Sequence, residues 1–379
     1  MKDINFVATC LFGLEKFVGE EIDALGYERR QTIDGRVYFK GPPEAVARCN
    51  MWLRTAERVY IELSSFNAES FTELFDGVKN IPWEKFIGKD DMFPVKGHSV
   101  KSVLHSIPDC QSIIKKAIVE RLKQSYGIEW FPETGIKYQI DFFIFCNKVS
   151  IMMDTSGEPL YKRGYRTKTN IAPIRETLAC AMVKLSRPRE NVILWDPFCG
   201  SGTIAIEAAL LMTNSAPGRN RAFAAEKYAW IPKKYFENAR EEARASFNSD
   251  TKFRAIATDI DGESVEIARD NIRRAGMWDY IDCFKKDALT IRRDDRRTTI
   301  VCNPPYGERM DTKTAAHELY RKMGRTFSKL SPWQIYIITS DEEFESLYGM
   351  KADKARKLYN GMIKCNLYQY FKNKEPRRT

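Results

Sequence analysis

The tetrapeptide Asn303-Pro304-Pro305-Tyr306 follows the apolar run "TTIVC" and combines an amide, two prolines and a flat ring. The Asn303 side-chain oxygen can accept one N–H bond from an exocyclic amine, and a proline-fixed backbone carbonyl can accept the other. The Tyr306 ring can stack on a base that has been turned out of its helix. Two such acceptors could orient the nitrogen lone pair, which is what methyl transfer to an exocyclic base amine would require. The structural alternative is a Pro-Pro turn that closes a strand.

A second informative stretch is "DPFCGSGT", which lies between an apolar strand and a helix of small residues. Gly200 and Gly202 allow unusual dihedral angles and close approach of a ligand. The N–H groups at the start of the helix can bind an anion. The stretch lacks the G-K-[ST] ending of a phosphate loop and the third glycine of a dinucleotide loop. We therefore expect a ligand other than ATP or a dinucleotide, and a merely structural glycine turn is the alternative.

Acidic residues follow the next two apolar strands of the series. Asp259 ends "RAIATD" and could accept both ribose hydroxyls of a nucleoside, whereas Asp261 could cap the next helix. Asp287 could accept an adenine amino proton while the Ala288 backbone N–H donates to the ring. Each acid alone could be a helix cap. Together with the glycine turn, they predict a cleft that binds adenosine without gripping phosphates.

The elements that carry these loops alternate between strand and helix from residue 170 onward. Strands are predicted at 192–196, 254–259, 281–288, 298–305 and 333–340, and helices at 174–186, 204–212, 262–276 and 315–331. Such alternation is typical of a Rossmann-like, doubly wound α/β sheet, whose strands deliver their carboxyl ends to one edge. Residues 1–160 contain two smaller α/β patterns without a catalytic cluster.

Composition limits the remaining classes. The 379 residues are 43% hydrophobic and 30% charged, and no apolar run approaches the ~20 residues of a membrane span. Nine cysteines without a C-x-x-C pair and three histidines argue against a metal site or a disulfide framework. The amino-terminal stretch does not resemble a signal peptide, so we expect a cytoplasmic protein without membrane or metal partners.

Charge is distributed unevenly along the chain. Residues 1–160 contain 20 Lys and Arg against 23 Asp and Glu, whereas residues 161–379 contain 41 against 28, a net charge of +13. The change begins at "YKRGYRTK", which mixes cations with aromatic rings and suits phosphates and bases. The predicted RNA-binding residues are Lys162, Arg163, Tyr165 and Arg166. A solvated linker is the alternative.

On these motifs the sequence resembles the class I S-adenosylmethionine-dependent methyltransferases, and within them the RNA guanine-N2 methyltransferases that carry a THUMP domain. The narrower resemblance is to the bacterial enzymes that form N2-methylguanosine in 23S ribosomal RNA, and it covers nearly the whole chain. It implies a ferredoxin-like domain at 1–65, a THUMP RNA-binding domain at 66–165 and a methyltransferase domain at 166–379.

The resemblance also implies roles for individual residues. It implies S-adenosylmethionine as cofactor, RNA (23S favoured) as partner, and Asn303, Pro304, Pro305 and Tyr306 as catalytic residues. The implied cofactor-binding residues are Ala172, Pro173, Asp196, Phe198, Cys199, Gly200, Ser201, Gly202, Thr203, Asp259, Ile260, Asp287, Ala288 and Asn303.

Two questions stay open at the level of sequence. Residues 215–254 form a long insertion between the glycine turn and Asp259, which we interpret as a substrate-holding element near the mouth of the site or as an ordinary surface helix. The alternatives for function are a tRNA guanine-N2 methyltransferase, a DNA adenine-N6 or cytosine-N4 methyltransferase, and a non-catalytic RNA-binding assembly factor.

Overall fold

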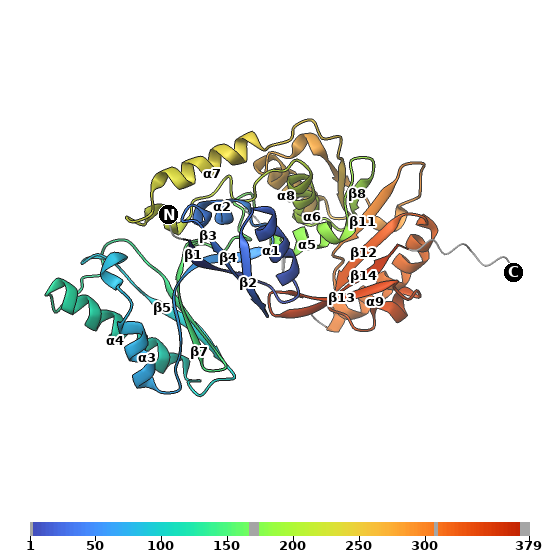
Figure 1. The fold of residues 1–379 in the computed structure, drawn as a ribbon. Coiled ribbons are helices and arrows are strands. Elements are labelled where there is room, and N and C mark those ends of the chain that lie inside the picture. Colours follow the sequence, from blue (N-terminus) through green and yellow to red (C-terminus); the bar gives the residue numbers. More distant parts are fainter. Residues whose placement is uncertain (1–2, 167–173, 307–309, 372–379) are drawn as a thin grey trace. The chain divides into compact units, whose positions relative to one another are not determined.

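The computed structural model describes residues 3–166, 174–306 and 310–371 (Figure 1). It divides into two compact units. Unit 1 comprises residues 1–10, 18–160 and 221–242, and unit 2 comprises residues 11–17, 161–220 and 243–379. No helix of the described residues is both long enough and apolar enough to cross a lipid bilayer.

Unit 1 is built on one sheet, whose strand order in the described chain is β2-β3-β1-β4-β7-β6-β5. All neighbouring strands pair antiparallel except β5 and β6. The strands are β1 (Ile4–Cys10), β2 (Glu28–Ile33), β3 (Arg36–Gly41), β4 (Ala56–Asn67), β5 (Val95–Val100), β6 (Ile140–Phe145) and β7 (Lys148–Asp154).

The long strand β4 joins the two halves of this sheet. Phe6 of β1 pairs with Ile61, and Tyr60 pairs with Asp154 of β7, so the predicted domain boundary near residue 65 falls inside a strand. The helices of this part are α1 (Glu15–Ala24), α2 (Ala45–Trp52), α3 (Phe71–Lys79), the short η1 (Trp83–Lys85) and α4 (Ile107–Tyr126). Helix α3 begins at a reciprocal capping box in which Ser70 and Glu73 satisfy each other's backbone N–H.

Residues 221–242 belong to unit 1, although they follow the glycine turn in the sequence. They contain η2 (Ala224–Lys227) and most of α7 (Lys233–Ala245). The ring of Tyr228 lies on that of Tyr138, with centroids 4.4 Å apart, and its hydroxyl donates to the Asp154 carbonyl. Arg48 forms two 2.8 Å hydrogen bonds to the Glu242 carboxylate. This part of the predicted 215–254 insertion is therefore packed into the amino-terminal fold.

Unit 2 contains the second sheet, whose strand order in the described chain is β10-β9-β8-β11-β12-β14-β13. Strands β8 to β12 run parallel to one another, and β14 pairs antiparallel with both β12 and β13. The strands are β8 (Ile193–Asp196), β9 (Ala255–Asp259), β10 (Ile281–Lys285), β11 (Thr298–Cys302), β12 (Gln334–Thr339), β13 (Lys354–Asn360) and β14 (Ile363–Tyr370). Sequence analysis did not identify the β13–β14 hairpin.

The helices of unit 2 alternate with its strands along the chain. They are α5 (Glu176–Ser186), α6 (Thr203–Met212), α8 (Gly262–Arg274), α9 (Met310–Phe327) and α10 (Phe344–Tyr348), with short turns η3 (Trp278–Tyr280), η4 (Ala288–Thr290) and η5 (Ser328–Leu330). One buried cluster joins Tyr320 and Phe327 of α9 to Trp195, Ile300 and Ile337 of three parallel strands. The predicted Rossmann-like α/β fold is confirmed.

Candidate active site

The glycine turn and the Asn-Pro-Pro-Tyr loop follow two neighbouring parallel strands, β8 and β11. Trp195 of β8 pairs with Ile300 of β11, so the residues that follow leave the sheet side by side at its carboxyl edge. From β8 the chain proceeds to β9 and β10 on one side, and β11 and β12 lie on the other. This reversal of strand order is where doubly wound sheets bind ligands. The structure therefore brings the two predicted loops to one place.

The glycine turn has the backbone conformation that its sequence requires. Gly200 and Gly202 have φ values of 50° and 81°, in the left-handed region that favours glycine. A Cβ on Gly202 would lie 3.2 Å from the Ala268 Cβ of helix α8, so that glycine also permits close packing. Thr203 then begins α6. Phe198 is half-buried, whereas Cys199, Ser201 and Thr203 are buried.

Asp259, at the end of β9, is bonded to the glycine turn. Its carboxylate accepts from the Gly200 N–H at 2.9 Å and from the Asp261 N–H at 3.0 Å. Asp261 accepts from the backbone N–H groups of Glu263 and Ser264, so it caps α8, the alternative role considered from sequence. A carboxylate has about four lone-pair sites, so Asp259 retains capacity for ligand hydroxyls.

The next strand end places the remaining adenosine candidates on the same edge. The Lys286 N–H donates to the Asp259 carbonyl at 2.9 Å, which holds the start of the β10 loop against the end of β9. Asp287 accepts from the Leu289 N–H at 2.8 Å and caps η4. Ala288 is buried, whereas Ile260 is 63% exposed and offers an apolar surface.

Asp196, the last residue of β8, is buried. Its carboxyl group accepts from the Phe198 N–H at 3.2 Å. Burial raises the pKa of Asp196 well above its ordinary value, and the nearby Asp259 acts in the same direction. In this structure Asp196 is therefore a buried acceptor for the Phe198 N–H, and its contact with a ligand stays a prediction.

The Asn-Pro-Pro-Tyr loop is part buried and part open. Asn303 and Tyr306 are half-buried, Pro304 is buried and Pro305 is exposed. The Pro305 carbonyl accepts a 3.1 Å hydrogen bond from the Tyr320 hydroxyl of α9. Sequence analysis did not single out Tyr320, because within its helix it looks like any other apolar-face residue.

The side chains of "YKRGYR" that were predicted to contact RNA differ in exposure. Arg163 and Tyr165 are 3% and 4% exposed, and both bond to the buried carboxylate of Glu207 on α6. Arg166 forms a 2.8 Å ion pair with buried Glu176. These side chains pair with buried carboxylates inside unit 2. Their contact with RNA stays a prediction.

Two further predictions have different outcomes. Lys162 is exposed, and its RNA contact stays a prediction. Ala172 and Pro173 lie outside the described residues.

Three parts of the chain match known families of protein domains. Residues 163–369 match the RMKL-like methyltransferase domain, residues 5–60 the RlmL ferredoxin-like domain and residues 68–154 the THUMP domain. The three kinds of domain expected from sequence are confirmed, and their proposed boundaries stay predictions.

Individual relatives agree with the family. The putative RNA methyltransferase YpsC of Bacillus subtilis is 44% identical over 380 residues, which is 100% of this chain and 98% of the relative. The ribosomal RNA large subunit methyltransferase K/L of Psychromonas ingrahamii is 32% identical over 94% of this chain but 49% of its own length. The chain thus spans about half the length of that relative.

One similar solved structure was determined with a ligand. The putative methyltransferase SMU.472, complexed with SAH, is 40% identical and has a TM-score of 0.90. The match covers 99% of this chain and 100% of that chain.

Proposed function

Because the chain belongs to the RMKL-like family of RNA methyltransferases, we propose that it transfers a methyl group to the exocyclic N2 of a guanine in RNA. The observation that carries this proposal is the position of the Asn303–Tyr306 loop. It follows β11 directly beside the glycine turn of β8, at the switch point of the sheet. The loop that would orient the amine and the turn that would bind the nucleoside therefore lie at the same carboxyl edge of the sheet.

S-adenosylmethionine is the cofactor, and it supplies an electrophilic methyl group on a sulfonium. The residues present fit it. The turn at Gly200–Gly202 allows close approach of a ligand, and Asp259 ends the second strand with lone pairs available for ribose hydroxyls. Asp287 and the apolar Ile260 follow on the same edge and suit an adenine ring.

The catalytic loop orients the base. The Asn303 side-chain oxygen accepts one hydrogen of the guanine amine, and we assign the Pro304 carbonyl to the other, since the Pro305 carbonyl already accepts from Tyr320. The half-buried Tyr306 ring stacks on the flipped base and excludes water. No strong general base is required, because a methylated ammonium loses its proton readily to solvent.

RNA from the large ribosomal subunit is the proposed substrate. The THUMP match at residues 68–154 and the net charge of +13 over residues 161–379 support a nucleic acid. The K/L relative is named for ribosomal RNA, which favours 23S rRNA over tRNA. On this proposal the protein acts in the cytoplasm, where ribosomes are assembled.

The test compares two variants of one residue. Asn303→Ala removes the amine acceptor and is expected to reduce methyl transfer by at least about 100-fold, whereas Asn303→Asp keeps an acceptor oxygen and retains more activity. SAH affinity, measured by calorimetry, should change far less than methyl transfer in both. Methyl transfer is followed with labelled cofactor on 23S rRNA, tRNA and DNA.

Nucleoside mass spectrometry then identifies the product. N2-methylguanosine is the expected product. N6-methyladenine or N4-methylcytosine, or incorporation into DNA alone, would contradict the proposal. Full activity of Asn303→Ala would refute the role assigned to that residue.

A further inference from the structure

The catalytic loop is held from behind by a buried tyrosine of α9. The Tyr320 side chain is fully buried, and its hydroxyl lies 3.1 Å from the Pro305 carbonyl oxygen and 3.1 Å from the Thr339 hydroxyl at the end of β12. We propose that Tyr320 is a positioning residue for methyl transfer, acting through the Pro305 peptide. This inference rests on the proposed function, in which that loop presents the target base.

The direction of each hydrogen bond follows from the groups involved. The Pro305 carbonyl can only accept, so the single Tyr320 hydroxyl proton points at it. The Thr339 oxygen accepts from the Asp341 backbone N–H at 3.1 Å, and its own proton remains available for the Tyr320 oxygen. The bonds therefore run in one direction, from the Asp341 N–H through Thr339 and Tyr320 to Pro305. Burial raises the pKa of Tyr320 above its ordinary value, so the hydroxyl keeps its proton.

This bond supplies the restraint that the two prolines lack. Proline fixes φ at Pro304 and Pro305, but it leaves ψ of Pro305 able to rotate. The hydrogen bond from Tyr320 holds the Pro305 carbonyl and so fixes that rotation. The orientation of the peptide that leads into Tyr306 is then set, and with it the aim of the stacking ring.

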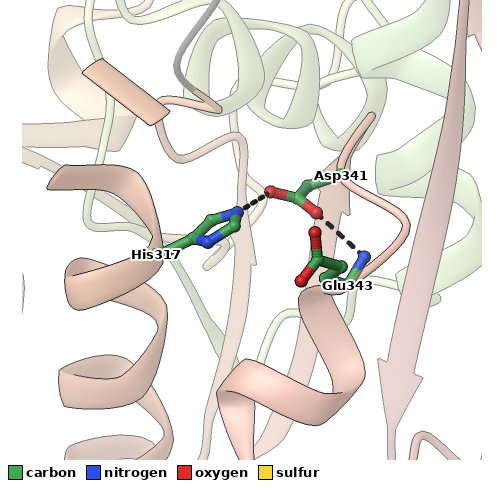
Figure 2. A group of neighbouring side chains, drawn as sticks. All are labelled: His317, Asp341 and Glu343. Atoms are coloured by element: carbon green, nitrogen blue, oxygen red, sulfur yellow. Dashed lines mark hydrogen bonds and ion pairs between the residues drawn. The ribbon is translucent and has the colours of Figure 1, made fainter. Parts of the chain in front are cut away.

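The far end of the network is anchored by the side chains of His317 and Asp341 and by the backbone of Glu343 (Figure 2). His317 Nε2 lies 2.8 Å from Asp341 Oδ2, and the other Asp341 oxygen accepts from the Glu343 N–H at 2.9 Å. The Glu343 carboxylate is 3.7 Å from Lys313 Nζ. One possible metal-ligand atom of each of His317, Asp341 and Glu343 lies within 4.8 Å of the other two. We interpret the group as a hydrogen-bonded cluster, because each of these side chains already has a partner within the protein. They tie α9, which carries Tyr320, to the loop that follows Thr339.

Tyr348 provides a matched control in the same cluster. It is 3% exposed and its ring stacks on Phe344 at 5.1 Å, while Tyr320 packs edge-on against the same Phe344 at 5.0 Å. Within the described residues the Tyr348 hydroxyl has no hydrogen-bond partner. Tyr→Phe at either position therefore removes one buried oxygen from the same core, but only at 320 does it release the catalytic loop.

The experiment measures methyl incorporation into 23S rRNA by the full chain, with any methylated product counted. Tyr320→Phe is expected to lower kcat by about 10- to 100-fold, because a small misplacement of a reacting group has effects of this order. KM for RNA and the Kd for SAH should stay within about twofold of wild type. Tyr348→Phe should leave kcat unchanged. Thr339→Val should lower kcat like Tyr320→Phe, and Thr339→Ser, which keeps the hydroxyl, should restore it.

Several results would overturn the inference. One is a kcat of Tyr320→Phe within twofold of wild type. Another is an equal loss in both Tyr→Phe variants that tracks their Tm values, which would indicate a structural effect alone. A methylated atom other than guanine N2 would refute the proposed function but leave this comparison intact, because total methyl incorporation is the readout.

Discussion

At the scale of single residues, the site combines side chains that are free to contact a ligand at the carboxyl edge of the sheet with side chains that are buried. Asp259 lies at the strand end and keeps lone pairs for a ligand, whereas Asp196 is buried. Both acids are the last residues of parallel strands, so sequence alone assigned both to cofactor binding. Burial separates them, because a carboxyl group removed from water resists ionisation.

Asp196→Asn tests this difference. Because burial raises the folded-state pKa of Asp196, the acid costs the ligand-free protein stability as pH rises from about 4 upward, where the unfolded carboxyl ionises. Asn removes that cost, so the variant should gain stability relative to wild type at pH 8 more than at pH 4. If Asp196 contacts the cofactor, SAH affinity falls by about tenfold or more. Denaturant unfolding at both pH values and calorimetry measure the two effects, and an unchanged pH dependence would contradict the first.

At the scale of elements, the segment after residue 160 shows that side-chain pairing, rather than amino-acid composition, determines which residues are exposed. "YKRGYR" is basic and aromatic, yet Arg163 and Tyr165 meet Glu207 of α6, and Arg166 also lies 3.4 Å from the Thr203 hydroxyl at the first turn of that helix. The segment thereby supports the helix that starts at the glycine turn. Glu207 lies more than 40 residues along the chain from Arg163 and Tyr165, so no local pattern reveals this pairing.

The Arg166–Glu176 pair predicts a pH effect. Burial raises the pKa of Glu176 from 4.5 to about 7, despite the opposing effect of Arg166. Between these values the folded state binds more protons than the unfolded state, so this group makes stability fall as pH rises through about 4.5 to 7. Glu176→Gln should flatten that slope, while Glu237→Gln, at an exposed position, should not. Unfolding free energies between pH 4.5 and 7.5 test this, and identical slopes in all three proteins would contradict it.

At the scale of the whole molecule, the chain leaves unit 2 after residue 220 and returns after residue 242. The intervening segment packs on the sheet of unit 1, through the contacts of Tyr228 with Tyr138 and Asp154. Unit 1 is therefore completed by residues that follow the glycine turn. A fragment ending at residue 160 would lack part of its own core.

Tyr228→Ala measures the contribution of this returning segment. Tyr228 is 2% exposed, so loss of its ring should cost about 3–5 kcal/mol of unfolding free energy. Tyr235→Ala, at a half-exposed position of the same segment, should cost less. Denaturant unfolding compares the variants, and protease cleavage within residues 221–242 should increase for Tyr228→Ala. Wild-type stability of that variant would show that the segment does not stabilise unit 1.

The sequence by itself determined the alternation of strands and helices in residues 170–340 and the loops that follow four of those strands. It could do so because apolar periodicity, glycine, proline and acidic residues at strand ends are local features. Tertiary structure alone decided the order β10-β9-β8-β11, the continuity of the unit 1 sheet through β4, the inward turn of "YKRGYR" and the bond from Tyr320 to Pro305. The physical reason is the same in each case. These features depend on pairing between residues distant in sequence, and the free energy of burial and hydrogen bonding selects such partners only once the chain is folded.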